Sequence, residues 1–274
     1  MFPPGHFHSP IPNLDEVHRD DALLFGPPPD SLPGIDLRET EQMALLARFA
    51  ALYPDIPFGD EPRPGLRYHY LNPSYSFSDA IMLHCMLRTL RPRELVEVGC
   101  GYSSCVTLDT KQHFLGQSLR TTFIDPNPQT VLSLLNEQDL LTTTLIPKTL
   151  QEVELEVFTR LGENDVLFID STHVSKIGSD VNRLVFEILP ALAPGVVIHI
   201  HDIFYPFEYP KVWVHQGIAW NEAYLLRAFL QYNERFEVML MNTYLAHRHR
   251  DFFARHMPDC LRNTGGSLWL RKRA

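Results

Sequence analysis

Short apolar runs alternate along the chain with longer stretches in which apolar positions recur every three or four residues. The apolar runs are typical of strands and lie at 94–98, 121–124, 142–146, 165–169, 195–200, 236–241 and 267–270. The amphipathic stretches predict helices, the clearest at 36–53, 78–90, 175–189 and 220–232. Because most of the strands are apolar on both faces and helices separate them, we predict an α/β fold. Its seven-stranded sheet is mostly parallel, doubly wound and covered on both faces.

Prolines set the N-terminal part apart from this pattern. They cluster in the segments FPP, SPIP, GPPP and EPRPG, all before residue 75, so long uninterrupted elements are not expected there. Asp36 and Glu39 form a capping-box pattern at the start of the one clear helix of this part. We therefore interpret residues 1–75 as a Pro-rich extension that packs on or covers the α/β domain, which spans residues 76–274.

Composition limits the classes of partner. The 274 residues include 33 acidic and 24 basic side chains, a formal charge of −9, which disfavours nucleic acid and anionic membranes as partners and leaves small molecules. The four cysteines form no CxxC pair and no zinc-binding spacing, as expected for free thiols in a reducing compartment. No signal sequence or membrane-spanning segment is visible, so we expect a cytoplasmic protein that could form homo-oligomers.

Polar residues follow four of the predicted strands at their carboxyl ends, where open parallel sheets bind ligands. The first strand delivers two glycines, Gly99 and Gly101, which allow a tight turn and a close approach of the backbone to a ligand. Ser103 and Ser104 then open a helix whose free N–H groups would face that ligand. The remaining strand ends carry Asp125, Asp170 with His173, and His201 with Asp202.

The spacing of these residues indicates a nucleoside ligand. Asp125 lies 26 positions beyond Gly99 at the end of the next strand, where a carboxylate can accept both hydroxyls of a ribose. The dinucleotide fingerprint GxGxxG is incomplete, because Ser104 occupies its third glycine position, and no phosphate-binding GxxxxGK[ST] loop occurs. Glu97 and the GxG turn instead suit a ligand without phosphates but with a charged amino-acid tail.

These motifs together resemble a known family. The runs LVEVGCGYSS, FIDPNP, DVLFIDSTHVSKIGSD and LPALAPGVVIHIHD, within residues 76–245, are similar to class I S-adenosylmethionine-dependent methyltransferases with their Rossmann-like fold. The resemblance is strongest to the bacterial small-molecule branch grouped with cephalosporin-hydroxylase-like and methyltransferase-24-like proteins. It implies that Glu97, Gly99 and Gly101 hold the methionine part of the cofactor, Asp125 the ribose, and that Asp170 stands beside the sulfonium. No adenine contact is evident after the third strand.

Methyl transfer also requires removal of a proton from the acceptor. His173 and His201 are the candidate bases, because histidine titrates near neutral pH. Asp170 and Asp202 could instead hold a divalent cation such as Mg²⁺, as the resemblance implies, since several O-methyltransferases of this fold bind Mg²⁺ through carboxylates at these strand ends. The aromatic segment 202–213 is a candidate acceptor pocket, and segment 72–76 a candidate cover for the cofactor.

The sequence thus favours a methyltransferase that uses S-adenosylmethionine and acts on a hydroxyl or amine of a small molecule. Two alternatives remain open. One is an oxidoreductase on the same fold, either nicotinamide-dependent or an iron enzyme with His and Asp ligands. The other is a nucleoside-binding module without catalytic activity.

Overall fold

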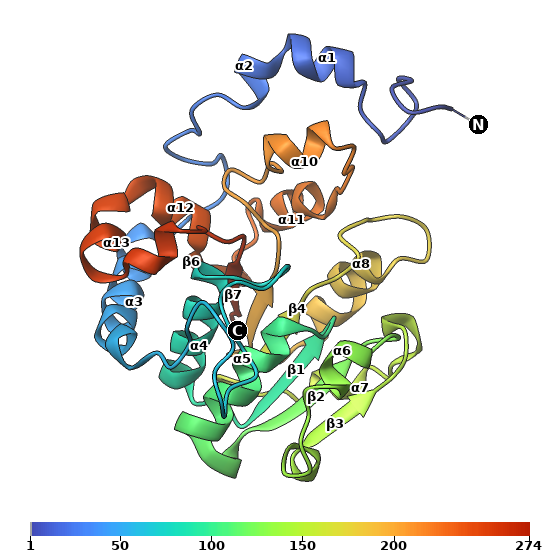
Figure 1. Ribbon diagram of the computed structural model, residues 1–274. Coiled ribbons are helices and arrows are strands. Elements are labelled where there is room, and N and C mark those ends of the chain that lie inside the picture. Colours follow the sequence, from blue (N-terminus) through green and yellow to red (C-terminus); the bar gives the residue numbers. More distant parts are fainter. Residues whose placement is uncertain (1) are drawn as a thin grey trace.

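The computed structural model describes residues 2–274 and contains a seven-stranded sheet in the order β3-β2-β1-β4-β5-β7-β6 (Figure 1). The first five strands of the chain run parallel to one another, and β7 runs antiparallel to both β5 and β6. The strand bounds are β1 Glu94–Val98, β2 Arg120–Ile124, β3 Thr143–Ile146, β4 Val166–Ile169, β5 Val197–Ile200, β6 Phe236–Met241 and β7 Leu268–Lys272. The predicted α/β fold class and its mostly parallel, doubly wound sheet are confirmed.

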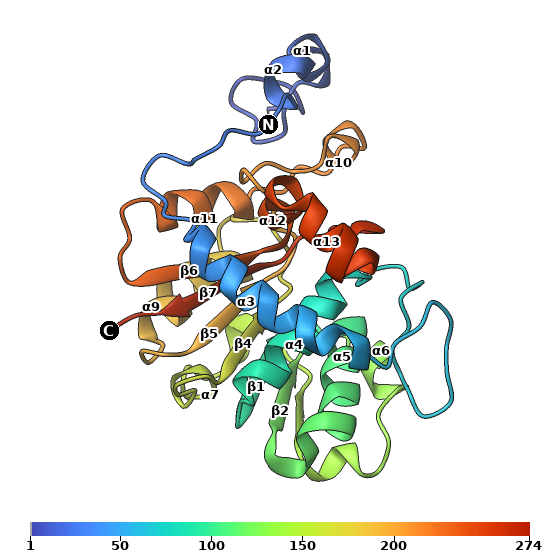
Figure 2. The ribbon, with the colours of Figure 1, turned by 90° about the vertical axis from the view of Figure 1, so that its left-hand side faces the viewer.

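Helices connect and cover these strands. Their bounds are α1 Leu14–Arg19, α2 Asp21–Leu24, α3 Glu39–Leu52, α4 Ser78–Leu90, α5 Tyr102–Thr110, α6 Gln129–Leu132, α7 Glu156–Thr159, α8 Asp180–Arg183, α9 Leu189–Ala191, α10 Lys211–His215, α11 Glu222–Leu230, α12 Asn242–Arg248 and α13 Arg250–His256. Helices α3, α4 and α5 lie side by side in front of the sheet in Figure 2. None of the helices within residues 2–274 combines the length and the apolar character needed to cross a bilayer.

The N-terminal part has two separate roles. Helix α3 packs against α4 and β6, and its Leu46 and Phe49 are fully buried in the common core. Helices α1 and α2 instead lie beside α10, away from the sheet (Figures 1 and 2), where Asp21 forms an ion pair with Lys211 at 2.6 Å. The division of the chain at residue 75 stays a prediction.

Element positions agree with the sequence pattern best where an element is buried. The predicted bounds of α4, β1 and β6 match the structure to the residue. The capping box at the start of α3 is wrong: the Oδ1 of Asp36 accepts a hydrogen bond from the amide of Arg38, and the helix begins at Glu39. The predicted helix 175–189 begins only at Asp180, with Ser179 as its N-cap, and contains a π-helical turn over Leu184–Ile188.

Candidate active site

A cleft of about 300 Å³ lies at the carboxyl ends of β1, β2 and β4. The chain winds outward in opposite directions from β1 and β4, so this is the point where the strand order reverses. Three of the sequence-predicted cofactor residues, Gly99, Asp125 and Asp170, line the cleft together. The position agrees with the expectation that ligands bind beyond the carboxyl ends of the strands.

The glycine turn after β1 has a strict steric requirement at its first glycine. Gly99 adopts φ +80°, and a Cβ at this position would lie 2.0 Å from the carbonyl oxygen of Asp170. The amide of Asp170 donates to the carbonyl of Val98 at 2.8 Å, so β1 and β4 are held together at this point. A Cβ on Gly101, by contrast, would meet no atom within 4 Å. Gly99 is needed for the fold itself, whereas Gly101 leaves space beside the turn.

Glu97 supports the turn from below. Its side chain is fully buried, and its Oε1 accepts hydrogen bonds from the hydroxyls of Ser103 at 2.5 Å and Ser104 at 2.9 Å. Its Oε2 is buried and has no hydrogen-bond partner among residues 2–274. Burial raises the pKa of Glu97 to about 8, although both serine hydroxyls act in the opposite direction. The two serines therefore use their side chains to hold Glu97, which leaves its second oxygen for a bound group.

Asp125 connects the second strand to the same turn. Its Oδ2 accepts the amide of Cys100 at 2.9 Å, and its Oδ1 accepts the amide of Asn127 at 2.7 Å. Helix α6 begins just beyond this contact, at Gln129. Each carboxylate oxygen has two lone pairs, so Asp125 keeps acceptor capacity on the cleft side.

The segment after β3 also lines the cleft, although the sequence shows no adenine contact there. Lys148, Thr149, Leu150 and Gln151 form this wall, together with Thr172 and Asp180 opposite. A capping box of Thr149 with Glu152 begins a short 3-10 helix in this segment. No sequence motif identifies these residues as part of a ligand site, because only the position of the folded loop brings them to the cleft.

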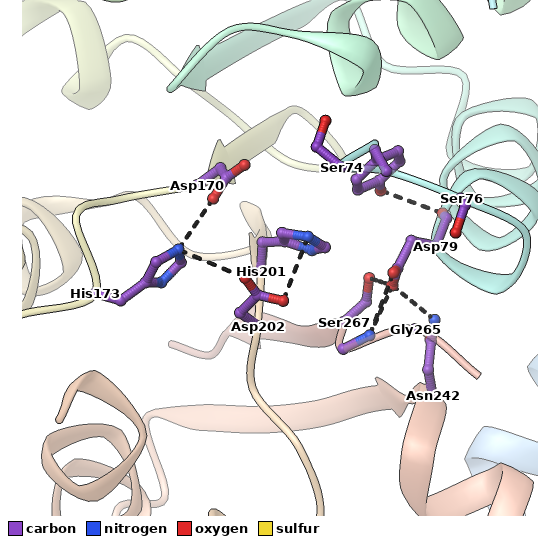
Figure 3. Close-up of polar contacts among 12 residues, drawn as sticks. Ser74, Ser76, Asp79, Asp170, His173, His201, Asp202, Asn242, Gly265 and Ser267 are labelled. Carbon is purple, nitrogen blue, oxygen red and sulfur yellow. Dashed lines mark hydrogen bonds and ion pairs between the residues drawn. The ribbon is translucent and has the colours of Figure 1, made fainter. Parts of the chain in front are cut away.

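A carboxylate–histidine cluster begins at one side of the cleft (Figure 3). The Nε2 of His173 lies 3.2 Å from Oδ1 of Asp170 and 3.7 Å from Oδ2 of Asp202. The Nε2 of His201 lies 3.5 Å from the other oxygen of Asp202. The four residues predicted to be near the reacting atoms are thus gathered in one place, at the ends of β4 and β5.

Glu222, at the first turn of α11, completes this cluster and was not predicted. Only 2% of Glu222 is exposed, and its Oε2 lies 2.9 Å from Nδ1 of His173. The hydroxyl of Ser171 donates to both of its oxygens at 3.0 Å. An acidic residue at a helix start is ordinary in sequence, so no signal distinguishes Glu222 without the tertiary contact.

The charges of the cluster differ from those of the free side chains. Burial alone would lower the pKa of His173, but the hydrogen bonds to Asp170 and Glu222 outweigh it and raise this pKa to about 10. Burial raises the pKa of Asp202 to about 6. Burial also acts to raise the pKa of Asp170, yet the nearby His201 and the bond to His173 bring it below the usual value. At neutral pH the cluster thus contains an imidazolium between carboxylates.

A buried hydrogen-bonded network lies behind His201. Asp79, at the start of α4, accepts hydrogen bonds from the amide of Gly266 at 3.0 Å, from Asn242 at 3.2 Å and from the hydroxyl of Ser267. Burial opposes ionisation of His201, but Asp170, Asp202 and Asp79 together raise its pKa. These contacts hold α12 and the residues just before β7 against α4 (Figure 3).

Aromatic side chains border the cluster on the side of segment 202–213. Trp220 packs on His173 at a centroid distance of 4.3 Å and on Trp213 at 5.3 Å, and Trp213 packs on Phe204 at 5.2 Å. Segment 72–76 also reaches the cluster, because the ring of Tyr75 lies 5.1 Å from that of His201. Both segments proposed from sequence for the acceptor and the cover therefore adjoin the predicted catalytic residues.

The donor geometry does not support the predicted metal site at Asp170 and Asp202. Within residues 2–274, no group of three or more His, Cys, Asp or Glu side chains is arranged to hold a metal ion. The His173 ring already lies between the two carboxylates and donates to Asp170. The arrangement therefore places an imidazolium where the sequence pattern had suggested a divalent cation.

The strand order with an antiparallel β7, the glycine turn after β1 and the acidic residues at the ends of β2 and β4 define a class I S-adenosylmethionine-dependent methyltransferase. A family described as "Methyltransferase domain" matches residues 96–203. A protein of Archaeoglobus fulgidus, described as an uncharacterized protein, is 31% identical over 169 residues, which is 60% of this chain and 75% of that protein. The chain belongs to this methyltransferase family.

Solved structures of methyltransferases are also similar to this chain. The SAH-bound methyltransferase PaMTH1 of Podospora anserina has 14% identity and a TM-score of 0.45, covering 96% of this chain and 97% of that one. The O-methyltransferase TomG of Streptomyces achromogenes, involved in tomaymycin synthesis and solved with SAM, has 15% identity and a TM-score of 0.47, with the same two coverages.

Proposed function

We propose that this protein transfers a methyl group from S-adenosylmethionine to a hydroxyl group of a small-molecule acceptor. The observation that carries the proposal is the position of Asp170. This carboxylate lines the cofactor cleft and also belongs to the carboxylate–histidine cluster, so the two sites meet at one residue. The net charge of −9 supports a small molecule rather than a nucleic acid as the acceptor.

The residues around the cleft fit the proposed cofactor. Glu97 has a buried oxygen without a partner beneath the turn, and Gly101 leaves space beside it, as an amino-acid tail would require. Asp125 keeps acceptor capacity for ribose hydroxyls. When bound, S-adenosylmethionine supplies a methyl group on a positively charged sulfur, which passes to the acceptor oxygen as the C–S bond breaks and its electron pair stays on sulfur.

The residues of the cluster have different roles in removing the proton of the acceptor. His173 donates through both ring nitrogens, so it has no free lone pair with which to accept a proton. Asp202 is an ionised carboxylate above pH 6 and takes the proton of the acceptor hydroxyl as the base. The role of base that the sequence suggested for His173 thus passes to Asp202. A neutral acceptor oxygen that develops negative charge suits this arrangement better than an amine, which develops positive charge.

Binding and turnover test the function separately. Calorimetric titrations compare S-adenosylmethionine with NAD, and we expect binding of the former only. Transfer of radiolabelled methyl groups is then measured with a panel of small alcohols, phenols and amines, where hydroxyl acceptors should react. Binding of NAD without S-adenosylmethionine would favour the oxidoreductase alternative, and binding without transfer to any acceptor would favour the nucleoside-binding module.

A further inference from the structure

The loop that follows β4 ends in a residue with an unusual backbone. His173 adopts φ +60°, a left-handed conformation that a β-carbon disfavours by about 1–2 kcal/mol. Its carbonyl accepts the amides of both Asn221 and Glu222 at 3.1 Å, and its own amide donates to the hydroxyl of Ser171 at 3.0 Å. The loop is thus pinned to the start of α11, and the pinning holds the histidine in this conformation.

The ring of His173 is fixed as firmly as its backbone. Glu222 lies 2.9 Å from Nδ1, and Asp170 lies 3.2 Å from Nε2. An ionised carboxylate accepts hydrogen bonds and donates none, so both ring nitrogens must carry a proton to satisfy both contacts. Trp220 covers one face of the ring, and only 5% of His173 is exposed. With both carboxylates ionised, the contact geometry therefore assigns an imidazolium to His173.

We propose that Glu222 is a positioning residue, which holds His173 as a fixed imidazolium between Asp170 and Asp202, facing the acceptor oxygen during methyl transfer. The proposal rests on the proposed function for the part that concerns transfer. Glu222 is not among the residues that line the cleft, and its carboxylate contacts the ring of His173 and the hydroxyl of Ser171. It is not among the residues that the sequence motifs identify.

The fixed charge has two consequences for the reaction. It attracts the negative charge that develops on the acceptor oxygen as its proton leaves, which is the stabilisation that a metal ion gives in other sites. It also balances Asp202, so that this carboxylate can stay ionised in a buried place. The groups that face the ring are Asp170 at the end of β4, Asp202 and His201 at the end of β5, and Glu222 on α11.

The test is the substitution Glu222→Gln, which keeps the size and the hydrogen-bonding oxygen but removes the charge. The matched control is Glu39→Gln, because Glu39 also binds a histidine, His249, at 2.8 Å and lies outside the cluster. The first readout is the pair of ¹⁵N shifts of the His173 ring in the protein without ligand, assigned by comparison with His173→Gln. Wild-type His173 should stay doubly protonated at pH 8, whereas the Glu222→Gln ring should be neutral at pH 9.

The second readout is methyl transfer to the fastest acceptor of the panel. We expect kcat of Glu222→Gln to be about 10- to 100-fold below wild type at pH 9 and to approach wild type near pH 6, with Kd for S-adenosylmethionine unchanged. Glu39→Gln should show no such pH-dependent ratio. A neutral His173 ring in the wild type at pH 8, or a Glu222→Gln to wild-type ratio that does not change with pH, overturns the proposal. If wild type transfers no methyl group at all, the proposed function fails, and the ring shifts still decide the charge of His173.

Discussion

Substitution of Gly99 by alanine tests whether the first turn of the sheet is built around a backbone contact. An alanine Cβ would lie 2.0 Å from the carbonyl oxygen of Asp170. The turn after β1 and the end of β4 would therefore have to separate by about 1 Å to reach even a tight contact. The left-handed conformation at φ +80° adds its own cost of about 1–2 kcal/mol for a residue with a β-carbon.

The magnitude follows from what the separation disrupts. The amide of Asp170 donates to the carbonyl of Val98 beside the contact, and the amide of Gly99 donates to the carbonyl of Ile124 at 2.9 Å. Loss of one such bond costs about 0.5–1.5 kcal/mol net. With the backbone cost, we expect Gly99→Ala to lower the free energy of unfolding by about 1.5–3.5 kcal/mol.

Two glycines provide matched controls for this experiment. Gly217 has φ +83°, and a Cβ added to it would meet no atom within 4 Å, so Gly217→Ala measures the backbone cost alone. Gly101 lies in the same turn as Gly99 with φ −173°, so Gly101→Ala should leave stability unchanged and lower only the affinity for S-adenosylmethionine. Urea unfolding gives the stabilities. Equal destabilisation by Gly99→Ala and Gly217→Ala, within about 0.5 kcal/mol, would refute the steric reasoning.

Three further predictions concern single carboxylates and their partners. The rate of methyl transfer should rise with pH with a midpoint near 6, because Asp202 accepts a proton only when ionised, and Asp202→Asn should abolish this limb of the pH–rate profile. Asp125→Asn should weaken binding of S-adenosylmethionine about 10-fold or more in calorimetry. The reason is that the Asp125 carboxylate both accepts the amide of Cys100 and lines the cleft. Arg67→Met should lower the urea-derived stability by about 3–5 kcal/mol, because buried Asp109 would lose the cation bound to it at 2.7 Å, and an unchanged midpoint would contradict this.

The sheet and the position of the site could be predicted from sequence because both depend on local pattern. Strands that are buried on both faces are largely apolar, so β4 is visible as a continuous run and β1 as a run interrupted by Glu97. Parallel strands deliver their next residues to one edge, which is why the sequence alone could place Asp125 and Asp170 together.

The roles inside the site could not be predicted in the same way, because they depend on distant contacts. The charge of His173 is set by Glu222 on α11, 49 residues further along the chain. The rule that ligands bind at the carboxyl ends of parallel strands does not identify a residue on a helix. The failed capping box has a similar origin. Glu39 is bound by Tyr244 and His249, more than 200 residues away, so its carboxylate is not available to cap its own helix.

The charges around the cleft connect these local contacts to the choice of ligand. Asp125, Asp170 and Asp180 line the cleft, and Lys148 is the basic side chain among its lining residues. NAD carries two phosphates, which the three carboxylates would repel in a partly buried place. S-adenosylmethionine carries a sulfonium, an ammonium and a carboxylate, and its net charge is positive. The fixed imidazolium of His173 lies on the far side of Asp170, so that the carboxylate separates it from a sulfonium in the cleft. The carboxylates thus favour a cationic methyl donor in the cleft, and the imidazolium of His173 favours an oxyanion that develops on the acceptor.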